Sequence, residues 1–425
     1  MKEKLLNIEV NSEIGKLEAV MLHTPGAEVE NMTPRNAQRA LYSDILNLSI
    51  AQKEYEQVSG VLNKFTKTYQ IADLLCELLD KHEEREALIG KICVSEEVTE
   101  YFEYLMDMSS KALTKVLIEG LPARINSLTA YLKDDYYALQ PLYNFYFTRD
   151  ASVSIGNKVL VCKMASKVRM RESFICEAIF RSKRVFDCDV LNAHDFQPGN
   201  NEVYMEGGDI LVAREDILLV GSGTRTSSQG IDMLINRLCK SGCTEKKHII
   251  VQQLPDSPES FIHLDMVFTL LDTDKAMVFE PLILGENQFQ TVHMIIENGK
   301  VSKIKSVNNI PSILKKLGME VDTVICGGSA DEWNQEREQW HSGANLFALA
   351  PGKVMAYARN VHTLNELDKI GFEIIPAWDV ISGKKEIQKI KNCVVTIEGS
   401  ELPRGGGGAR CMTMPLRRSP VKWPE

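Results

Sequence analysis

The sequence predicts an α/β protein with a helical insertion, because two textures alternate along the chain. Between residues 35 and 121 there is no proline, and between residues 61 and 119 Gly90 is the only glycine. After Asp150 the chain changes to short apolar runs that end at glycine, proline or polar residues. We therefore expect a helical block near residues 65–140 and an α/β body that spans both ends of the chain.

Hydrophobic periodicity predicts the individual elements. Alternating apolar residues in 17–21 indicate an opening strand before the turn HTPG, and apolar residues in 71–79 have the i, i+3, i+4, i+7 spacing of an amphipathic helix. The segments VSIGNKVLVCKMA, DILLVGSG and HIIVQQL indicate strands, and 172–184 indicates a helix. The echo between the GGD at 207–209 and the GGS at 327–329 hints at repeated strand-and-helix modules without establishing a repeat.

Composition excludes several classes of protein. A net charge of −9 over 425 residues argues against nucleic acid or an anionic membrane as a partner. No apolar run approaches the ~18 residues of a membrane span. The ten cysteines form no paired framework and no CxxC, and Cys239 and Cys243 are the only close pair. We expect reduced thiols in a cytoplasmic protein without structural zinc.

The stretch ELPRGGGGARCMTMP near the end of the chain is unusual. Four consecutive glycines, Gly405 to Gly408, cost backbone entropy on ordering, and such a run is often a flexible linker. This run instead leads directly into the apolar segment that contains Cys411. The alternative to a linker is that backbone approaches a ligand closely and that Cys411 faces the same ligand.

Three further stretches carry groups that could do chemistry. In NFYFTRD, Asp150 could simply cap the next turn and pair with Arg149. In MEGGD, Glu206 flanks two glycines and could belong to an ordinary β-turn. In HLDMVF, His263 and Asp265 would face the same side of a strand, which favours a functional site over a lone structural histidine. The H-x-D pair could also bind a metal, but no further ligands follow at helpful spacing, so none is expected.

The combination of a thiol with several acids restricts the substrate. A cysteine nucleophile needs an acid or base such as His263. The carboxylates of Asp150, Glu206 and Asp265 would raise the pKa of the Cys411 thiol, whereas reactive thiols are usually surrounded by cations. Such a site makes sense if the substrate itself is the cation. A planar guanidinium matches two carboxylates that each accept a bidentate pair.

Taken together, FTRD, MEGGD, HLD and the glycine-rich stretch that closes on CMTMP resemble the bacterial arginine deiminases of the guanidino-group-modifying superfamily. LEAVMLHTPG and MTPRN resemble that family's first strand and loop, so the resemblance covers essentially the whole chain. It implies five ββαβ modules around a pseudo-fivefold axis, formed by residues 1–64 and 141–425. Residues 65–140 would be the inserted helical domain.

The resemblance also implies a reaction and the residues that carry it. L-arginine would be hydrolysed to L-citrulline and ammonia through a thiouronium-type adduct on Cys411, without metal or organic cofactor, in a cytoplasmic homo-oligomer. The catalytic residues would be Cys411, His263 as general acid/base, Asp150 and Asp265 on the guanidinium, and Glu206 beside the histidine. The substrate-binding residues would be Asn144, Phe147, Arg169, Arg225 and Gly405.

Two departures from the family pattern and two rival functions remain. Gly406 stands where many members carry an arginine, which Arg404 or Arg410 could replace, and Ser43 stands at a commonly acidic position. One rival is an enzyme that acts on agmatine or methylated arginine, or that transfers the amidino group. The other is a silent arginine-binding protein. Arg169 and Arg225 favour a substrate with a free α-carboxylate.

Overall fold

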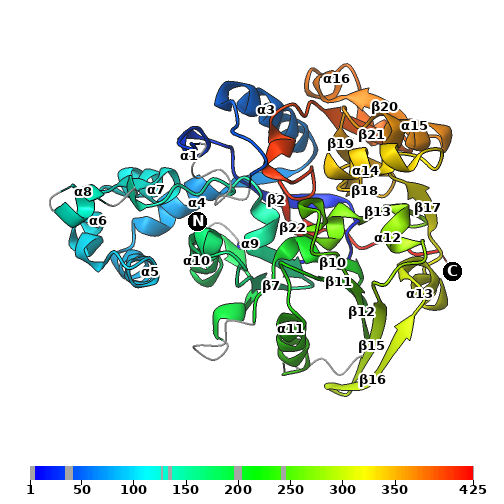
Figure 1. Ribbon diagram of the computed structural model, residues 1–425, viewed down its shortest axis with the longest axis horizontal. Coiled ribbons are helices and arrows are strands. Elements are labelled where there is room, and N and C mark those ends of the chain that lie inside the picture. The colour runs from blue at the N-terminus through cyan, green and yellow to red at the C-terminus, as the bar shows by residue number, and fades with distance from the viewer. Residues whose placement is uncertain are drawn as a thin grey trace.

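The computed structural model describes residues 5–33, 42–125, 128–132, 136–195, 203–240 and 246–424. Sheets and helices alternate through most of these residues, whereas helices dominate between Ile71 and Leu132 (Figure 1). The predicted α/β class is therefore confirmed.

Five sheets share one plan, in which an antiparallel pair of strands is followed by a strand parallel to the second. In four of the sheets the chain runs from the pair through a helix to the parallel strand, and in the first the antiparallel partner comes from the end of the chain. The first sheet contains β22 (Met414–Arg418), β2 (Leu17–Leu22) and β3 (Lys67–Gln70), and the second contains β6 (Ser152–Ile155), β7 (Lys158–Val161) and β9 (Asp189–Asn192). The third contains β10 (Ile210–Arg214), β11 (Ile217–Ser222) and β12 (Lys247–Gln253) and is extended by β15 (Thr291–Glu297) and β16 (Lys300–Val307). The fourth contains β13 (Phe268–Asp272), β14 (Lys275–Val278) and β17 (Asp322–Ile325), and the fifth contains β18 (Phe347–Ala350), β19 (Lys353–Tyr357) and β21 (Cys393–Ile397), extended by β20 (Glu373–Pro376).

The helices between these strands cover the sheets and bury one apolar face each. They are α3 (Leu48–Phe65), α10 (Met170–Arg181), α11 (Ser228–Lys240), α13 (Ile310–Lys316) and α15 (Val361–Lys369). Further helices are α1 (Ala27–Glu30), α9 (Thr148–Ala151), α12 (Glu280–Ile283), α14 (Glu332–Trp340) and α16 (Ala377–Ile381). Two small sheets pair β1 (Leu6–Asn7) with β8 (Phe186–Asp187) and β4 (Leu121–Pro122) with β5 (Tyr137–Leu139).

The helical block extends to one side of the sheets (Figure 1). It contains α4 (Ile71–Leu79), α5 (His82–Ser95), α6 (Phe102–Met106), α7 (Ser110–Glu119) and α8 (Leu128–Leu132). All five apolar residues of the predicted pattern in α4 are buried, so the amphipathic helix is confirmed. Strand β3 lies within the range 65–140 but pairs with β2, so the helices begin only after it.

Most other predicted elements are also present. The opening strand is β2, the strand segments are β6 with β7, β11 and β12, and the helix expected at 172–184 is α10. The strand expected at HLDMVF was wrong at its start. Residues Leu264–Met266 form one 3₁₀ turn, and β13 begins only at Phe268.

The cysteines and the helices bear on two further predictions. The nine cysteines in the described ranges form no disulfide with one another, and Cys243 lies outside those ranges. Residues 34–36 of the MTPRN segment also lie outside the described ranges. Among the described residues no helix has the length and apolar character needed to cross a bilayer.

Candidate active site

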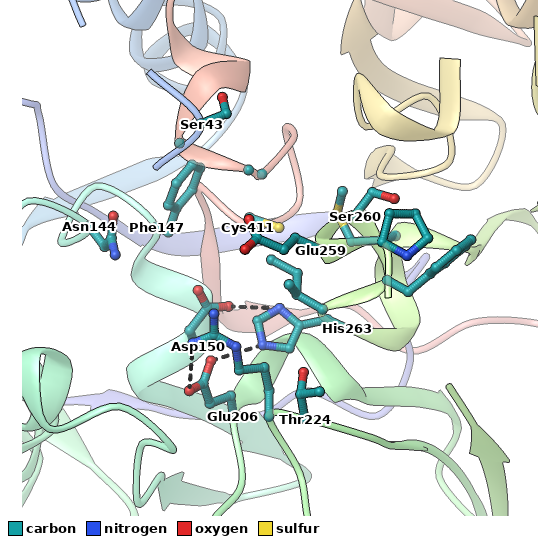
Figure 2. A pocket seen from close by; sticks show the side chains of 18 of the residues that line it. Ser43, Asn144, Phe147, Asp150, Glu206, Thr224, Glu259, Ser260, His263 and Cys411 are labelled. Carbon is teal, nitrogen blue, oxygen red and sulfur yellow. Dashed lines mark hydrogen bonds and ion pairs between the residues drawn. The ribbon is translucent and has the colours of Figure 1, made fainter. Parts of the chain in front are cut away.

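One cavity of about 290 Å³ brings together nine of the ten residues predicted for the site (Figure 2). Its walls come from the ends of different sheets and from the glycine-rich segment. The nine are Asn144, Phe147, Asp150, Arg169, Glu206, Arg225, His263, Gly405 and Cys411. The tenth, Asp265, is fully buried behind Cys411, with its carboxylate oxygens 3.8 and 4.0 Å from the Cys411 Sγ. Residues far apart in sequence therefore form one site.

Close packing explains the four consecutive glycines. A Cβ on Gly405 would lie 2.2 Å from the Tyr146 hydroxyl oxygen, and one on Gly407 would lie 2.6 Å from the Phe147 ring and 2.9 Å from the Cys411 Cβ. A Cβ on Gly408 would lie 2.7 Å from a side-chain atom of Asn345. Gly406 has a left-handed φ of 84°, which side chains disfavour. The run is therefore an ordered wall of the cavity and not a linker.

Asn345 ties the nucleophile segment to the adjacent acid. Its Oδ1 accepts hydrogen bonds from the backbone N–H groups of Arg410 (3.0 Å) and Cys411 (3.2 Å). Its Nδ2 donates to the backbone oxygen of Asp265 at 3.2 Å. No motif in the sequence marked this residue, which is 1% exposed. It fixes the thiol and the carboxylate relative to each other.

His263 lies between two acids, and Figure 2 shows both turned toward its ring. Its Nε2 is 3.0 Å from Oε2 of Glu206, and its Nδ1 is 3.7 Å from Oδ1 of Asp150. Burial alone would lower the pKa of His263, but the charge of Asp150, with Cys411 and Glu206 also adjacent, raises that pKa well above its usual value. Glu206 has its own pKa lowered to about 2, because hydrogen bonding to His263 and the charge of Arg225 outweigh its burial. The imidazole is therefore held as a cation.

The two candidate guanidinium-binding acids are each paired with a buried arginine. Asp265 Oδ2 accepts from Arg410 Nη1 at 2.6 Å, and Arg410 also binds both carboxylate oxygens of Glu13, at 3.0 and 3.1 Å. Arg410 is therefore a buried supporting residue and does not replace the missing loop arginine. Neither its role nor that of Glu13 could be read from the sequence.

Asp150 belongs to the second pair. Its Oδ2 accepts from Arg169 Nη1 at 2.7 Å, and Arg169 is held in turn by Glu172 through Nε and Nη2 at 2.8–3.2 Å. The simple interpretation, in which Asp150 pairs with its neighbour Arg149, was wrong, because the ion pair is made with a residue 19 positions later. The backbone N–H of Arg149 donates to the Cys411 oxygen instead.

The thiol is held in its protonated form. Burial is the largest cause, the charge of Asp265 adds to it, and His263 opposes both, so that the pKa of Cys411 rises to about 11. The free site therefore combines a neutral thiol with a cationic imidazole.

The remaining predicted residues extend from the acids to the rim. Arg225 Nη1 lies 3.8 Å from Glu206 Oε1, and the Arg225 side chain is 14% exposed. Arg169 is 4% exposed and also donates toward the backbone oxygens of Asn144 and Phe147, both at 3.4 Å. The cavity thus has an acidic inner end beside Cys411 and a cationic group, Arg225, that keeps solvent contact.

A family model described as arginine deiminase matches residues 38–418. The chain is 34% identical to an arginine deiminase of Borreliella afzelii, with 99% of this chain and 100% of that protein covered. It is 32% identical to arginine deiminase 1 of Staphylococcus epidermidis, with 97% and 99% covered.

This chain belongs to the arginine deiminase family. The resemblance predicted from FTRD, MEGGD, HLD and CMTMP is thereby confirmed, and with it the prediction of a hydrolytic enzyme. Solved structures share the fold at low identity. An amidinotransferase from Microseira wollei matches with a TM-score of 0.51 at 15% identity, covering 98% of both chains. The N-terminal domain of ArgZ, bonded to a reaction intermediate, matches with a TM-score of 0.50 at 13% identity, covering 94% of this chain and 98% of that one.

The two positions that depart from the family pattern, Gly406 and Ser43, both lie at the rim of the cavity. Ser43 donates from its hydroxyl (2.9 Å) and its N–H (3.1 Å) to the backbone oxygen of Arg404. The Arg404 side chain pairs with Asp44 and is 38% exposed. A short polar residue at position 43 thus holds the glycine-rich loop through its backbone.

Proposed function

We propose that this enzyme hydrolyses L-arginine to L-citrulline and ammonia on Cys411. The observation that carries the proposal is a set of three reactive groups in one cavity. These are the Cys411 thiol and two buried atoms, Asp150 Oδ1 and His263 Nδ1, which have no hydrogen-bond partner among the described residues. Buried polar atoms without partners cost free energy, so they indicate a ligand that supplies the missing bonds. A guanidinium has donors to spare for Asp150 Oδ1, while Nδ1 of the protonated His263 donates to an acceptor that forms in the reaction, the thiolate or the departing nitrogen.

The charges of the site support a substrate-activated thiol. The thiol loses its proton when the bound guanidinium offsets the acids around it. The thiolate attacks the guanidinium carbon, and protonated His263 gives its proton to the departing ammonia, which leaves a thiouronium-type adduct and a neutral imidazole. His263 then takes a proton from water, hydroxide attacks the adduct carbon, and the C–S bond breaks. The last proton leaves the product to solvent, and citrulline is released.

We assign the binding roles by charge and depth. Asp150 and Asp265 hold the guanidinium, and Glu206 keeps His263 protonated. Arg225, Arg169 and Asn144 take the α-carboxylate, while Phe147 and the Gly405 backbone contact the aliphatic stem. Because Arg169 is already held by Asp150 and Glu172, Arg225 supplies the more available charge.

The same acids could in principle take a metal ion, since ligand atoms of Asp150, Glu206 and His263 lie within 4.8 Å of one another. Two oxygens in this trio, Asp150 Oδ2 and Glu206 Oε2, already bind Arg169 and His263. Protein cations therefore compensate the acids, which favours a guanidinium over a metal. We infer catalysis without metal or organic cofactor.

The architecture and cellular setting complete the proposal. We infer that the five sheets are the ββαβ modules of a propeller with pseudo-fivefold symmetry, formed by the predicted residues 1–64 and 141–425 together with β3, and that the part of 65–140 after β3 is an inserted helical domain. Their shared plan supports this arrangement. We also propose a cytoplasmic homo-oligomer.

Product analysis with the purified protein tests the reaction. We expect citrulline and ammonia in equal amounts from L-arginine, with much slower use of agmatine or methylated arginine. Turnover that requires an amine acceptor would indicate an amidinotransferase. Arginine binding without any product would indicate a silent binding protein, and either result would overturn the proposal.

A further inference from the structure

A second cavity of about 610 Å³ lies beside the active site and is walled by aromatic rings. Helix α14 contributes two tryptophans one heptad apart, Trp333 and Trp340, with 83% and 44% of their surfaces exposed. Three phenylalanines complete the ring set: Phe261, Phe279 and Phe289. We call this cavity the aromatic groove. A tryptophan with 83% of its surface exposed at a groove rim is unusual for a surface without a ligand.

The aromatic groove also contains one polar atom without a partner. The Ser260 side chain is buried (9% exposed), and its hydroxyl oxygen has no hydrogen-bond partner among the described residues. Ser260 lines the aromatic groove and the active-site cavity alike. The unpartnered hydroxyl therefore belongs to a residue of the wall between the two cavities.

The wall between the two cavities connects the groove to the catalytic histidine. Gln339, on α14, donates from Nε2 to the backbone oxygens of Ser260 (2.9 Å) and Met266 (3.3 Å). These two residues bracket His263. A ligand that moves α14 therefore moves the segment that positions the imidazole.

We propose that the aromatic groove is a regulatory site for a small planar aromatic molecule that carries one hydrogen-bonding group. Its volume is within the ~300–1,000 Å³ of small-molecule sites. Fourteen residues line it, fewer than the roughly 20–30 per side of a standard protein interface, which favours a small molecule over a second copy of the chain. Offset or edge-on stacking on the five rings selects a planar body, and Ser260 selects the polar group.

Benzamide is a suitable probe, because it combines a planar ring with one amide. Binding is measured by tryptophan fluorescence, since two of the four tryptophans line the groove. We expect saturation with Kd on the order of 1 mM, as is typical of a ligand this small. Trp333→Ala should weaken binding at least about tenfold. Trp378→Ala, which removes an exposed tryptophan (43%) on α16, away from the groove, should leave it unchanged. Cyclohexanecarboxamide, which keeps the amide but lacks the planar ring, should bind severalfold more weakly.

Turnover provides the second readout and rests on the proposed arginine hydrolysis. Benzamide should change kcat or KM for arginine without competing with it, and Trp333→Ala should abolish this effect while keeping the basal rate. Non-saturable fluorescence, equal binding to Trp333→Ala, or competition with arginine would overturn the site. Unchanged turnover at saturation would overturn regulation. A shift of the unliganded enzyme to a smaller species in Trp333→Ala would assign the groove to a second copy and overturn the small-molecule proposal. Failure of arginine turnover in the wild type would be seen separately, because the fluorescence assay does not need it.

Discussion

The two halves of the active site contain the same chain of Glu, Arg and Asp side chains, but its charge has opposite effects on the two groups beside it. On one side Glu13 holds Arg410, which holds Asp265 beside the Cys411 thiol. On the other side Glu172 holds Arg169, which holds Asp150 beside His263. In both, a buried arginine fixes a carboxylate in place. The carboxylate disfavours the thiolate of Cys411 but favours the imidazolium of His263.

The halves differ in their access to the cavity. Arg169 lines the cavity, whereas Arg410 is 1% exposed and lies behind the thiol. Arg410 can act only as scaffold, whereas Arg169 can also contact a ligand. Mutations in the two halves should therefore separate stability from substrate recognition.

The largest expected effect on turnover comes from replacing the sulfur atom of Cys411. Cys411→Ser should lower turnover by at least about 10³-fold with little change in fold, because the hydroxyl is a far weaker nucleophile. Citrulline formation measures it, with Cys76→Ser as the control, since Cys76 lies in the helical block. A Ser variant that kept more than a few per cent of activity would exclude Cys411 as nucleophile.

The buried pair of Glu13 and Arg410 should contribute to the stability of the fold. The charges of Arg410 and Arg149, with hydrogen bonds from Arg410, outweigh burial and lower the pKa of Glu13 from 4.5 to about 2. A lowered folded-state pKa stabilises the fold above the unfolded value and loses that effect as pH falls toward 2. Glu13→Gln should therefore cost about 3 kcal/mol at pH 7 and roughly half as much at pH 3.

Urea unfolding at several pH values measures this difference. Glu18→Gln is the control, because Glu18 pairs with Arg417 on the surface and should contribute less than about 1 kcal/mol. A Glu13→Gln cost that did not shrink between pH 7 and pH 3 would show that the Glu13–Arg410 pair does not account for the stability.

The sequence predicted which residues share the site better than it predicted their local structure. His263 and Asp265 were expected to meet by strand alternation, yet they reach the site through an extended residue followed by a 3₁₀ turn. Asn345, Glu13 and the pairing of Arg410 were not foreseen. They act across 65 to 397 positions of sequence, and no local pattern encodes such contacts. The motifs identified groups at the cavity, whereas the residues that support them emerge only from packing.

The thiol itself provides a direct probe of the Asp265 side. With a pKa of about 11, Cys411 should react with iodoacetamide at pH 7 roughly 10²-fold more slowly than an ordinary cysteine of pKa ~8.5. The rate should rise as pH approaches 11, and Asp265→Asn should lower the thiol pKa while destroying catalysis. Peptide mass spectrometry assigns the alkylation to Cys411. A Cys411 that titrated below pH 7 in the free enzyme would contradict this electrostatic account.

Replacing Arg225 should affect substrate binding alone, whereas replacing Arg169 should affect both binding and catalysis. Arg225→Ala should raise KM for arginine about 10–100-fold, the effect of losing a hydrogen bond to a charged group. Agmatine, which lacks the carboxylate, should be affected less than about threefold. Arg169→Ala should also lower kcat, because Arg169 holds Asp150. Equal loss for both substrates in Arg225→Ala would exclude its role at the carboxylate.

The smallest effect should come from Arg404, the one loop cation at the rim beside Gly406. Its pair with Asp44 is solvent-exposed on both sides, 38% and 59%, and such pairs contribute about 0–1 kcal/mol. If Arg404 only tethers the loop, Arg404→Ala and Asp44→Ala should each change kcat/KM by less than about fivefold, and the double variant should be no worse than either single one. The main loop anchor would then be the Arg404 backbone oxygen, which both alanine variants retain and which Ser43 binds. A loss above about tenfold in Arg404→Ala, with Asp44→Ala unaffected, would instead show that Arg404 reaches the substrate.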